Sequence, residues 1–319
     1  MTEETEIVLD RRRLRRSVTF WRAAGVGALA LAIGAIALPG KTLTTLLEQP
    51  QIARVAIEGT ILENRDQLKM LDKIAGDSKV AALLVYVNSP GGTTTGGEAI
   101  YEALRKVAVK KPVVAQFGTV AASAGYIVGM GTDHIVSRGN TITGSIGVIA
   151  QWPEVASMLD KLGVKVNEIK SGSLKATPSM FLPLDEGGRK VTQGMVDEGF
   201  RWFLSLVETR RGLKTADIAG LEQGRIFSGR EALTLKLVDE IGGEDEAVAW
   251  LTEKRGIAKD LKVVNWKPSA VDGWGFPKAQ ASLEGGIAAA AAKELVRTAT
   301  SAAHLDTLTL DGLVSVWHP

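Results

Sequence analysis

Residues 80–88 read VAALLVYVN and run directly into Ser89-Pro90-Gly91-Gly92, and this stretch decides the class of fold. The run is long and almost entirely apolar. Such a run is typical of a strand covered on both faces, as in parallel sheets flanked by helices. A helix is expected to follow over residues 96–107. We therefore expect a buried strand whose carboxyl end leads through a glycine loop into a helix.

Strands and helices alternate along the rest of the chain, which predicts an α/β fold with a largely parallel sheet. The other expected strands or extended segments are residues 52–57, 113–117, 134–137, 146–151, 164–169 and 261–266. The other expected helices are residues 66–75, 127–130, 152–162, 184–211, 228–235 and 244–255.

The chain divides into five segments by composition. They are a basic N-terminus (1–22), an apolar segment (23–40), a polar connector (41–51), a globular domain (52–266) and a C-terminal tail (267–319). The tail contains an Ala-rich segment (286–303) that is expected to be helical, followed by an apolar end (308–317). Packing on its own domain or on a sister subunit is the favoured role, and a docking arm, a lid or a partner helix are the alternatives.

The N-terminus has the pattern of a membrane signal. A cluster of arginines precedes an uncharged apolar run over residues 23–38, which Pro39-Gly40 closes. The run is slightly short of the roughly 20 residues that span a bilayer, and Phe20 and Trp21 extend it. We expect an uncleaved signal anchor, although Ala35-Ile36-Ala37 leaves cleavage as an alternative. The positive-inside bias then puts the globular domain on the far side of the membrane from the cytoplasm.

Composition excludes several classes of protein. Among 319 residues, 45% are hydrophobic and 23% are charged, as in an ordinary globular protein. The net charge is +2, with no basic stripe in the globular domain, which argues against nucleic-acid binding. Cysteine is absent, so disulfides, thiolate metal sites and a cysteine nucleophile are excluded. The histidines, His134, His304 and His318, lie too far apart in sequence for a metal site. We expect no metal and no cofactor.

A candidate nucleophile lies in Ala121-Ala122-Ser123-Ala124-Gly125-Tyr126, between an expected strand and an expected helix. Small neighbours let another backbone approach the Ser123 hydroxyl closely, and a strand-to-helix turn directs N–H groups beside it. The same pattern is common in plain packing, so the turn alone does not establish a nucleophile. The glycines Gly91 and Gly92 allow main-chain N–H groups to face outward, as stabilisation of an oxyanion requires.

A serine nucleophile needs a base. His134 is the one histidine in the globular domain, and we interpret it as structural, because it sits at the start of a strand after an aspartate. Lysine is the other option, since Ser–Lys pairs follow the same logic as the triad. A free lysine has a pKa of about 10.4, so burial must lower it by roughly three units for base catalysis near neutral pH. Lys175 is the candidate, because residues 171–178 contain no carboxylate that would hold it charged.

Several motifs together resemble the signal peptide peptidase A family of bacterial membrane-bound serine proteases. The resemblance covers residues 52 to 254 and is specific because the motifs occur in register. The motifs are Ser89-Pro90-Gly91-Gly92, Ala121-Ala122-Ser123-Ala124-Gly125-Tyr126, Thr143-Gly144-Ser145-Ile146-Gly147-Val148, Ser171-Gly172-Ser173-Leu174-Lys175, and the later stretches 224–232 and 237–243.

The resemblance implies a fold like those of Clp protease and crotonase, with repeated ββα units. It implies that Ser123 is the nucleophile and Lys175 the general base, while Ser145 aims the lysine. The implied oxyanion donors are the N–H groups of Gly92 and Ser123, with Gly91 as the alternative. Many members have Asp after the lysine, where this chain has Ala176. That departure bears on how the loop around Lys175 packs and on substrate specificity, and not on the Ser123–Lys175 dyad.

The resemblance also implies partners and a location. It implies a homo-oligomeric ring that assembles each site from adjacent subunits, with the catalytic domain on the periplasmic side of the inner membrane. The implied substrates are remnants of signal peptides and other unfolded segments. A crotonase-like acyl-CoA enzyme is one alternative, against which the anchor argues, because acyl-CoA chemistry is cytoplasmic. A non-catalytic ring scaffold of the same fold is another.

Overall fold

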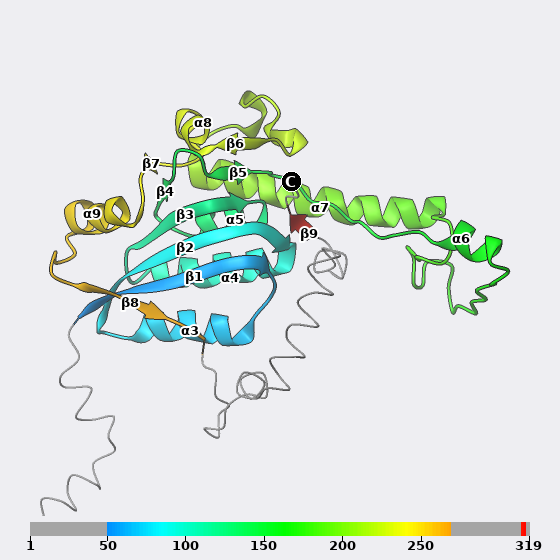
Figure 1. Ribbon diagram of the computed structural model, residues 1–319, viewed down its shortest axis with the longest axis horizontal. Coiled ribbons are helices and arrows are strands. Elements are labelled where there is room, and N and C mark those ends of the chain that lie inside the picture. Colours follow the sequence, from blue (N-terminus) through cyan, green and yellow to red (C-terminus); the bar gives the residue numbers. More distant parts are fainter. Residues whose placement is uncertain (1–49, 269–313, 317–319) are drawn as a thin grey trace, which may run out of the picture. The chain divides into compact units, whose positions relative to one another are not determined.

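A computed structural model of the chain describes residues 50–268 and 314–316 (Figure 1). The predicted anchor at residues 23–40 lies outside these ranges, as does most of the tail. Within the described ranges, no helix combines the length and the apolar character needed to span a bilayer.

The described strands form one sheet with the path β6-β5-β3-β2-β1-β8, to which β4, β7 and β9 are joined at the side. Neighbours pair in parallel, except for the antiparallel pairs β5–β6 and β2–β9. The strands are β1 (Gln51–Ile61), β2 (Val80–Thr93), β3 (Val113–Ala122), β4 (His134–Ser137), β5 (Ile142–Gly144), β6 (Ile226–Ser228), β7 (Glu240–Ile241), β8 (Lys262–Trp266) and β9 (Val314–Val316). The predicted α/β fold with a mostly parallel sheet is confirmed.

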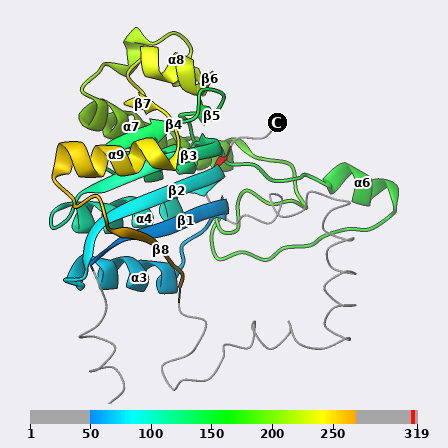
Figure 2. The ribbon, with the colours of Figure 1, turned by 60° about the vertical axis from the view of Figure 1, so that its left-hand side comes forward.

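Helices cover both faces of this sheet (Figure 2). The α-helices are α3 (Arg65–Gly76), α4 (Thr94–Ala108), α5 (Ala124–Met130), α6 (Ala156–Lys161), α7 (Glu186–Arg211), α8 (Gly229–Thr234) and α9 (Glu244–Arg255), and the short 3-10 turns are η1 (Thr215–Asp217) and η2 (Leu221–Gln223). Strand β2 shows why two layers form. Its Leu83 and Val85 belong to the apolar cluster that includes α3 and α4, whereas Ala82 and Leu84 belong to the cluster that includes α9. Burial on both sides explains the continuous apolar run.

Helix α7 is bound to the core at its carboxyl end. The guanidinium of Arg210 donates to the carbonyls of Met130 (2.9 Å) and Thr132 (2.8 Å) at the end of α5. Arg211 forms an ion pair with Asp239 at 2.7 Å. The other end of α7 extends away from the sheet beside α6 and the loops that flank it (Figure 1). We call residues 152–185 the arm.

Four sequence-based expectations about the described residues were wrong. The 89–92 segment is not a loop, because Gly91 and Gly92 continue β2 by pairing with Thr60 and Ile61 of β1. Residues 146–151 do not form a strand, since β5 ends at Gly144 and the residues that follow form a cavity wall. In the arm, helix α6 is shorter than expected, and residues 164–169 form no strand.

The helix expected over residues 286–303 of the C-terminal tail lies outside the described residues, and only part of the apolar end of the tail is described. Residues 314–316 form the strand β9, because their main chain pairs with the exposed edge of β2. The rest of the tail lies outside the described residues.

Candidate active site

Ser123 occupies a strained turn between β3 and α5. Its backbone angles are φ 58° and ψ −120°, an arrangement that is unfavourable for any residue with a Cβ. Strain of this kind persists where the surrounding structure imposes it, and it gathers at functional sites. A serine on a sharp strand-to-helix turn is also the geometry that presents a nucleophilic hydroxyl in other hydrolases. A turn that served only to pack β3 against α5 would not require this strained backbone, so the strain favours a functional role for Ser123.

The small residues beside Ser123 are needed for close packing. A Cβ on Gly125 would lie 2.9 Å from the carbonyl oxygen of Ser89. A Cβ on Gly97 of α4 would lie 3.2 Å from the Cβ of Ala124. Strand β2 and helix α4 thus approach the serine turn more closely than larger residues would allow, as the sequence predicted.

Strand pairing places Ser145 next to Ser123. Ala122 pairs with Gly144 in the parallel ladder of β3 and β5. Ser123 and Ser145 are the next residues after this pair, so they leave the two neighbouring strands side by side. The Ser123 N–H donates to the Gly144 carbonyl at 2.9 Å, and the Ser145 N–H donates to the Arg225 carbonyl at 3.0 Å. Ser145 is also in the left-handed region, with φ 51°.

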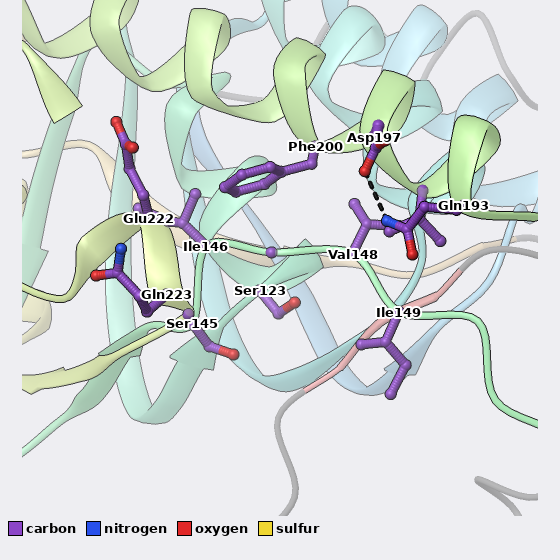
Figure 3. A pocket seen from close by; sticks show the side chains of 13 residues that line it. Ser123, Ser145, Ile146, Val148, Ile149, Gln193, Asp197, Phe200, Glu222 and Gln223 are labelled. Carbon is purple, nitrogen blue, oxygen red and sulfur yellow. Dashed lines mark hydrogen bonds between the residues drawn. The ribbon is translucent and has the colours of Figure 1, made fainter. Parts of the chain in front are cut away.

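The two serines line one cavity of about 410 Å³ (Figure 3). Phe200 and Asp197 reach it from α7, and Ile146 and Val148 form part of its apolar wall. Sequence reasoning missed Phe200, because nothing in the periodicity of a helix tells which face borders a cavity. The lining residues are Ser123, Ser145, Ile146, Gly147, Val148, Ile149, Gln193, Val196, Asp197, Phe200, Glu222, Gln223 and Gly224.

Among the described residues, the lining includes no lysine and no histidine, and its two carboxylates accept hydrogen bonds from neighbours. Asp197 accepts from the Gln193 amide at 2.7 Å, and Glu222 accepts from the Thr215 hydroxyl at 2.9 Å. His134 lies elsewhere, where it contacts Glu240 at 3.1 Å and stacks on Trp250. Its environment agrees with the structural role expected for it.

Lys175 does not reach this cavity within the chain. Its side chain is exposed on the arm and is not part of the cavity lining. Its main-chain N–H donates to the Gly172 carbonyl at 3.1 Å. The next residue, Ala176, has φ 58°. Among the described residues, the ones other than glycine that have a positive φ are Ser123, Ser145, Ala176 and Lys236. Three of these four are a predicted site residue or lie directly beside one.

The predicted oxyanion donors differ in their surroundings. The Gly91 N–H donates to Ser89 Oγ at 3.0 Å, and the Ser123 N–H has the Gly144 carbonyl as its acceptor. Both groups already have partners, which counts against them as oxyanion donors in this arrangement. Gly92 lies on the edge of β2, paired with Ser315 of β9.

A buried tyrosine fixes the helix that follows the serine. The hydroxyl of Tyr126 donates to the Leu237 carbonyl at 2.7 Å, and burial raises the pKa of this phenol, so it stays a donor. We expect Tyr126→Phe to lower the free energy of unfolding by about 1–2 kcal/mol, because the buried carbonyl loses its partner. Urea denaturation measures this change. Tyr101→Phe is the control, and an equal loss in both variants would contradict the assigned role.

Comparison with known proteins identifies the family. The sequence model of peptidase family S49 matches residues 105–258, and that of Clp protease matches residues 54–140. The chain is 37% identical to protease slr0021 of Synechocystis sp., over 70% of this chain and 79% of that protein. It is 32% identical to signal peptide peptidase SppA of Enterococcus faecium, over 77% of this chain and 84% of that protein. The chain belongs to peptidase family S49.

Membership of family S49 makes the chain a serine peptidase with a Clp-protease-like α/β fold. It is also 35% identical to Protease 4 of Haemophilus influenzae, over 62% of this chain and 34% of that protein, so it spans about a third of that longer relative. These matches give no support to the crotonase-like enzyme or to the non-catalytic scaffold.

Proposed function

We propose that this S49 peptidase is a membrane-anchored serine endopeptidase in which Ser123 is the nucleophile and Lys175 of an adjacent copy is the base. The observation that carries the proposal is the strained Ser123 turn, which lines a cavity with Ser145 but with no lysine or histidine from residues 50–268 or 314–316. A site of this kind is incomplete until a base is supplied from outside the described fold.

The position of Lys175 supports supply from another copy. The lysine is exposed on the arm, which extends beyond the sheet (Figure 1). Its neighbours on the arm expose large apolar side chains, which is typical of a protein–protein contact. These side chains are Met158, Leu162, Val164, Ile169, Leu174, Met180 and Phe181.

The reaction follows the Ser–Lys scheme. The Ser123 hydroxyl attacks the carbonyl carbon of the scissile peptide bond while the amine of Lys175 takes its proton. The tetrahedral intermediate collapses to an ester on Ser123, and the lysine passes the proton to the leaving amine. Water then hydrolyses the ester, with the lysine again as base. Ser145 is positioned beside Ser123 to orient the incoming amine by a hydrogen bond.

The cavity and the N-terminus support the choice of substrate and location. Ile146, Val148 and Phe200 give the cavity an apolar wall, which fits small or apolar side chains of unfolded segments. One relative is named as a signal peptide peptidase. We propose remnants of signal peptides as substrates, with residues 23–40 as the anchor and the domain on the extracytoplasmic side of the inner membrane.

The test is covalent labelling of the full chain with a serine-reactive fluorophosphonate probe. We expect Ser123→Ala to abolish labelling, and Lys175→Ala to slow it about 10³-fold, as for loss of a general base. Lys165→Ala, which removes another exposed lysine of the arm, is the matched control and should label normally. Equal labelling of all variants would refute the dyad.

A further inference from the structure

Helix α9 leaves part of the sheet face beside it uncovered. The helix packs on an apolar row that crosses three strands (Figure 2) and consists of Leu84, Val114 and Val136. Side chains two positions further along a strand lie on the same face of the sheet. On these strands that second row is polar and consists of Tyr86, Gln116 and Arg138.

The polar row borders a cavity of about 460 Å³. This cavity and the one beside Ser123 have no lining residue in common. Helix α5, which follows Ser123, belongs to the apolar cluster on the other face of the sheet. A ligand of this second cavity would therefore leave the Ser123 cavity open. The lining residues are Arg54, Tyr86, Gln116, Gly118, Thr119, Arg138, Asn140, Thr141 and Glu244.

Arg54 has a fixed position in the wall of this cavity. Its guanidinium lies 5.1 Å from the centroid of the Tyr86 ring, and its Nη1 donates to Asn265 Oδ1 at 3.1 Å. Its buried Nε lies 3.1 Å from Glu244 Oε2, in a geometry that gives no hydrogen bond. A guanidinium that is already held in place loses little conformational entropy when it binds an oxyanion.

Arg138 is the second cation of the lining. Its side chain is exposed, and no carboxylate of the described residues forms an ion pair with it. The carboxylate of Glu246 feels the charge of Arg138 but already accepts the Gly243 N–H at 2.6 Å. Arg54 and Arg138 together with Glu244 give the described lining a formal charge of +1.

The lining fits an organic molecule with a single negative charge. One excess positive charge matches a carboxylate, whereas a phosphate dianion would be repelled by Glu244. The side-chain amides of Gln116 and Asn140 contain both donors and acceptors, as hydrogen bonding to a peptide requires. The volume lies in the range of cavities that hold small organic molecules.

We propose that this cavity binds the C-terminal carboxylate of a short peptide through the guanidinium groups of Arg54 and Arg138. A guanidinium can bind a carboxylate with two parallel hydrogen bonds. A source of such ligands is present, because every peptide bond that a peptidase hydrolyses leaves a product with a new C-terminal carboxylate. The inference depends neither on Lys175 as the base nor on the membrane anchor.

The test is isothermal titration calorimetry of the full chain carrying Ser123→Ala, which prevents hydrolysis. N-acetyl-trialanine and its C-terminal amide are each titrated into chains with and without Arg138→Gln. With Arg138 present, we expect the carboxylate form to bind about tenfold more tightly than the amide, because it gains charge-assisted hydrogen bonds. With Arg138→Gln, the difference should fall below about threefold. Binding in the Ser123 cavity does not respond to Arg138, so the cycle isolates the second cavity.

Two further variants make the result specific. Arg189→Gln removes an exposed arginine of α7 outside the lining and should keep the tenfold difference. Thr119→Asp adds a negative charge to the lining and should weaken binding of the carboxylate form about tenfold, with little effect on the amide. Thermal denaturation checks that each variant is folded.

Several outcomes would overturn the inference. They are no binding of N-acetyl-trialanine, equal binding of its two forms, and a tenfold difference that survives Arg138→Gln in a folded chain. Inorganic phosphate is added as a competitor. If phosphate displaces the peptide at a lower concentration than the peptide's own Kd, the cavity is a phosphate site and the assignment to peptides is wrong. None of these outcomes affects the proposed roles of Ser123 and Lys175, which the labelling experiment tests separately.

Discussion

Mixing chains that carry Ser123→Ala with chains that carry Lys175→Ala is expected to restore peptidase activity that neither variant has alone. In a site shared between copies, a Lys175→Ala chain supplies the serine and a Ser123→Ala neighbour supplies the lysine. Random mixing in a symmetric ring gives about a quarter of the sites both groups. We therefore expect about a quarter of the native kcat, measured with a fluorogenic peptide after the variants are dissociated and reassembled together.

The control for this experiment is a mixture of Ser123→Ala chains with chains that carry both substitutions. That mixture has no intact serine and should stay inactive. If the first mixture also stays inactive although native chains regain activity after the same treatment, the serine and the lysine act within one chain. The arm would then have to fold back to bring Lys175 to the cavity.

Gly92→Ala is expected to lower the free energy of unfolding by about 3 kcal/mol or more. A Cβ at this position would lie 1.9 Å from the carbonyl oxygen of Ile61, and a main-chain atom within a parallel ladder cannot move aside cheaply. Alanine keeps the main-chain N–H, so loss of an oxyanion donor as such is not part of the effect. Urea denaturation measures the change, and kcat/KM should fall as the edge of β2 shifts.

Gly76→Ala is the matched control for this prediction. Gly76 ends α3, and a Cβ there would meet no atom within 4 Å. We expect this variant to change the free energy of unfolding by less than about 1 kcal/mol, in favour of the folded state. A Gly92→Ala chain as stable as the Gly76→Ala chain would mean that the edge of β2 is not held as described.

The sequence was most informative where burial dictates composition. The apolar run of β2 predicted a strand between two helical layers, because both of its faces are covered. The motif around Ser123 predicted a strand-to-helix turn with close backbone contacts, which Gly97 and Gly125 provide. These features depend on local chemistry, so they can be read from a single chain.

The sequence was least informative where the outcome depends on distant partners. Residues 146–151 have the apolar pattern of a strand, but they border a cavity because Phe200 faces them from α7. Residues 314–316 lie in the apolar end of the tail, for which the sequence predicted no helix or strand, and they form a strand because they pair with the edge of β2. Lys175 was assigned by motif, and the structure leaves it outside the cavity. In the first two cases the deciding contact lies far away in sequence.

Helix α7 makes the width of the cavity depend on the position of the arm. The helix is fixed at one end by Arg210 and Arg211, and it continues at the other end into the arm. At 1.5 Å per residue, Phe200 lies about 15 Å from that fixed end and Gln193 about 25 Å. If α7 tilts about its fixed carboxyl end, Gln193 moves further than Phe200. The part of the cavity near Gln193 then opens or closes more than the part near Phe200. A neighbouring copy that contacted the arm, as proposed above, would therefore change the width of the cavity entrance while leaving the floor beside Ser123 nearly still.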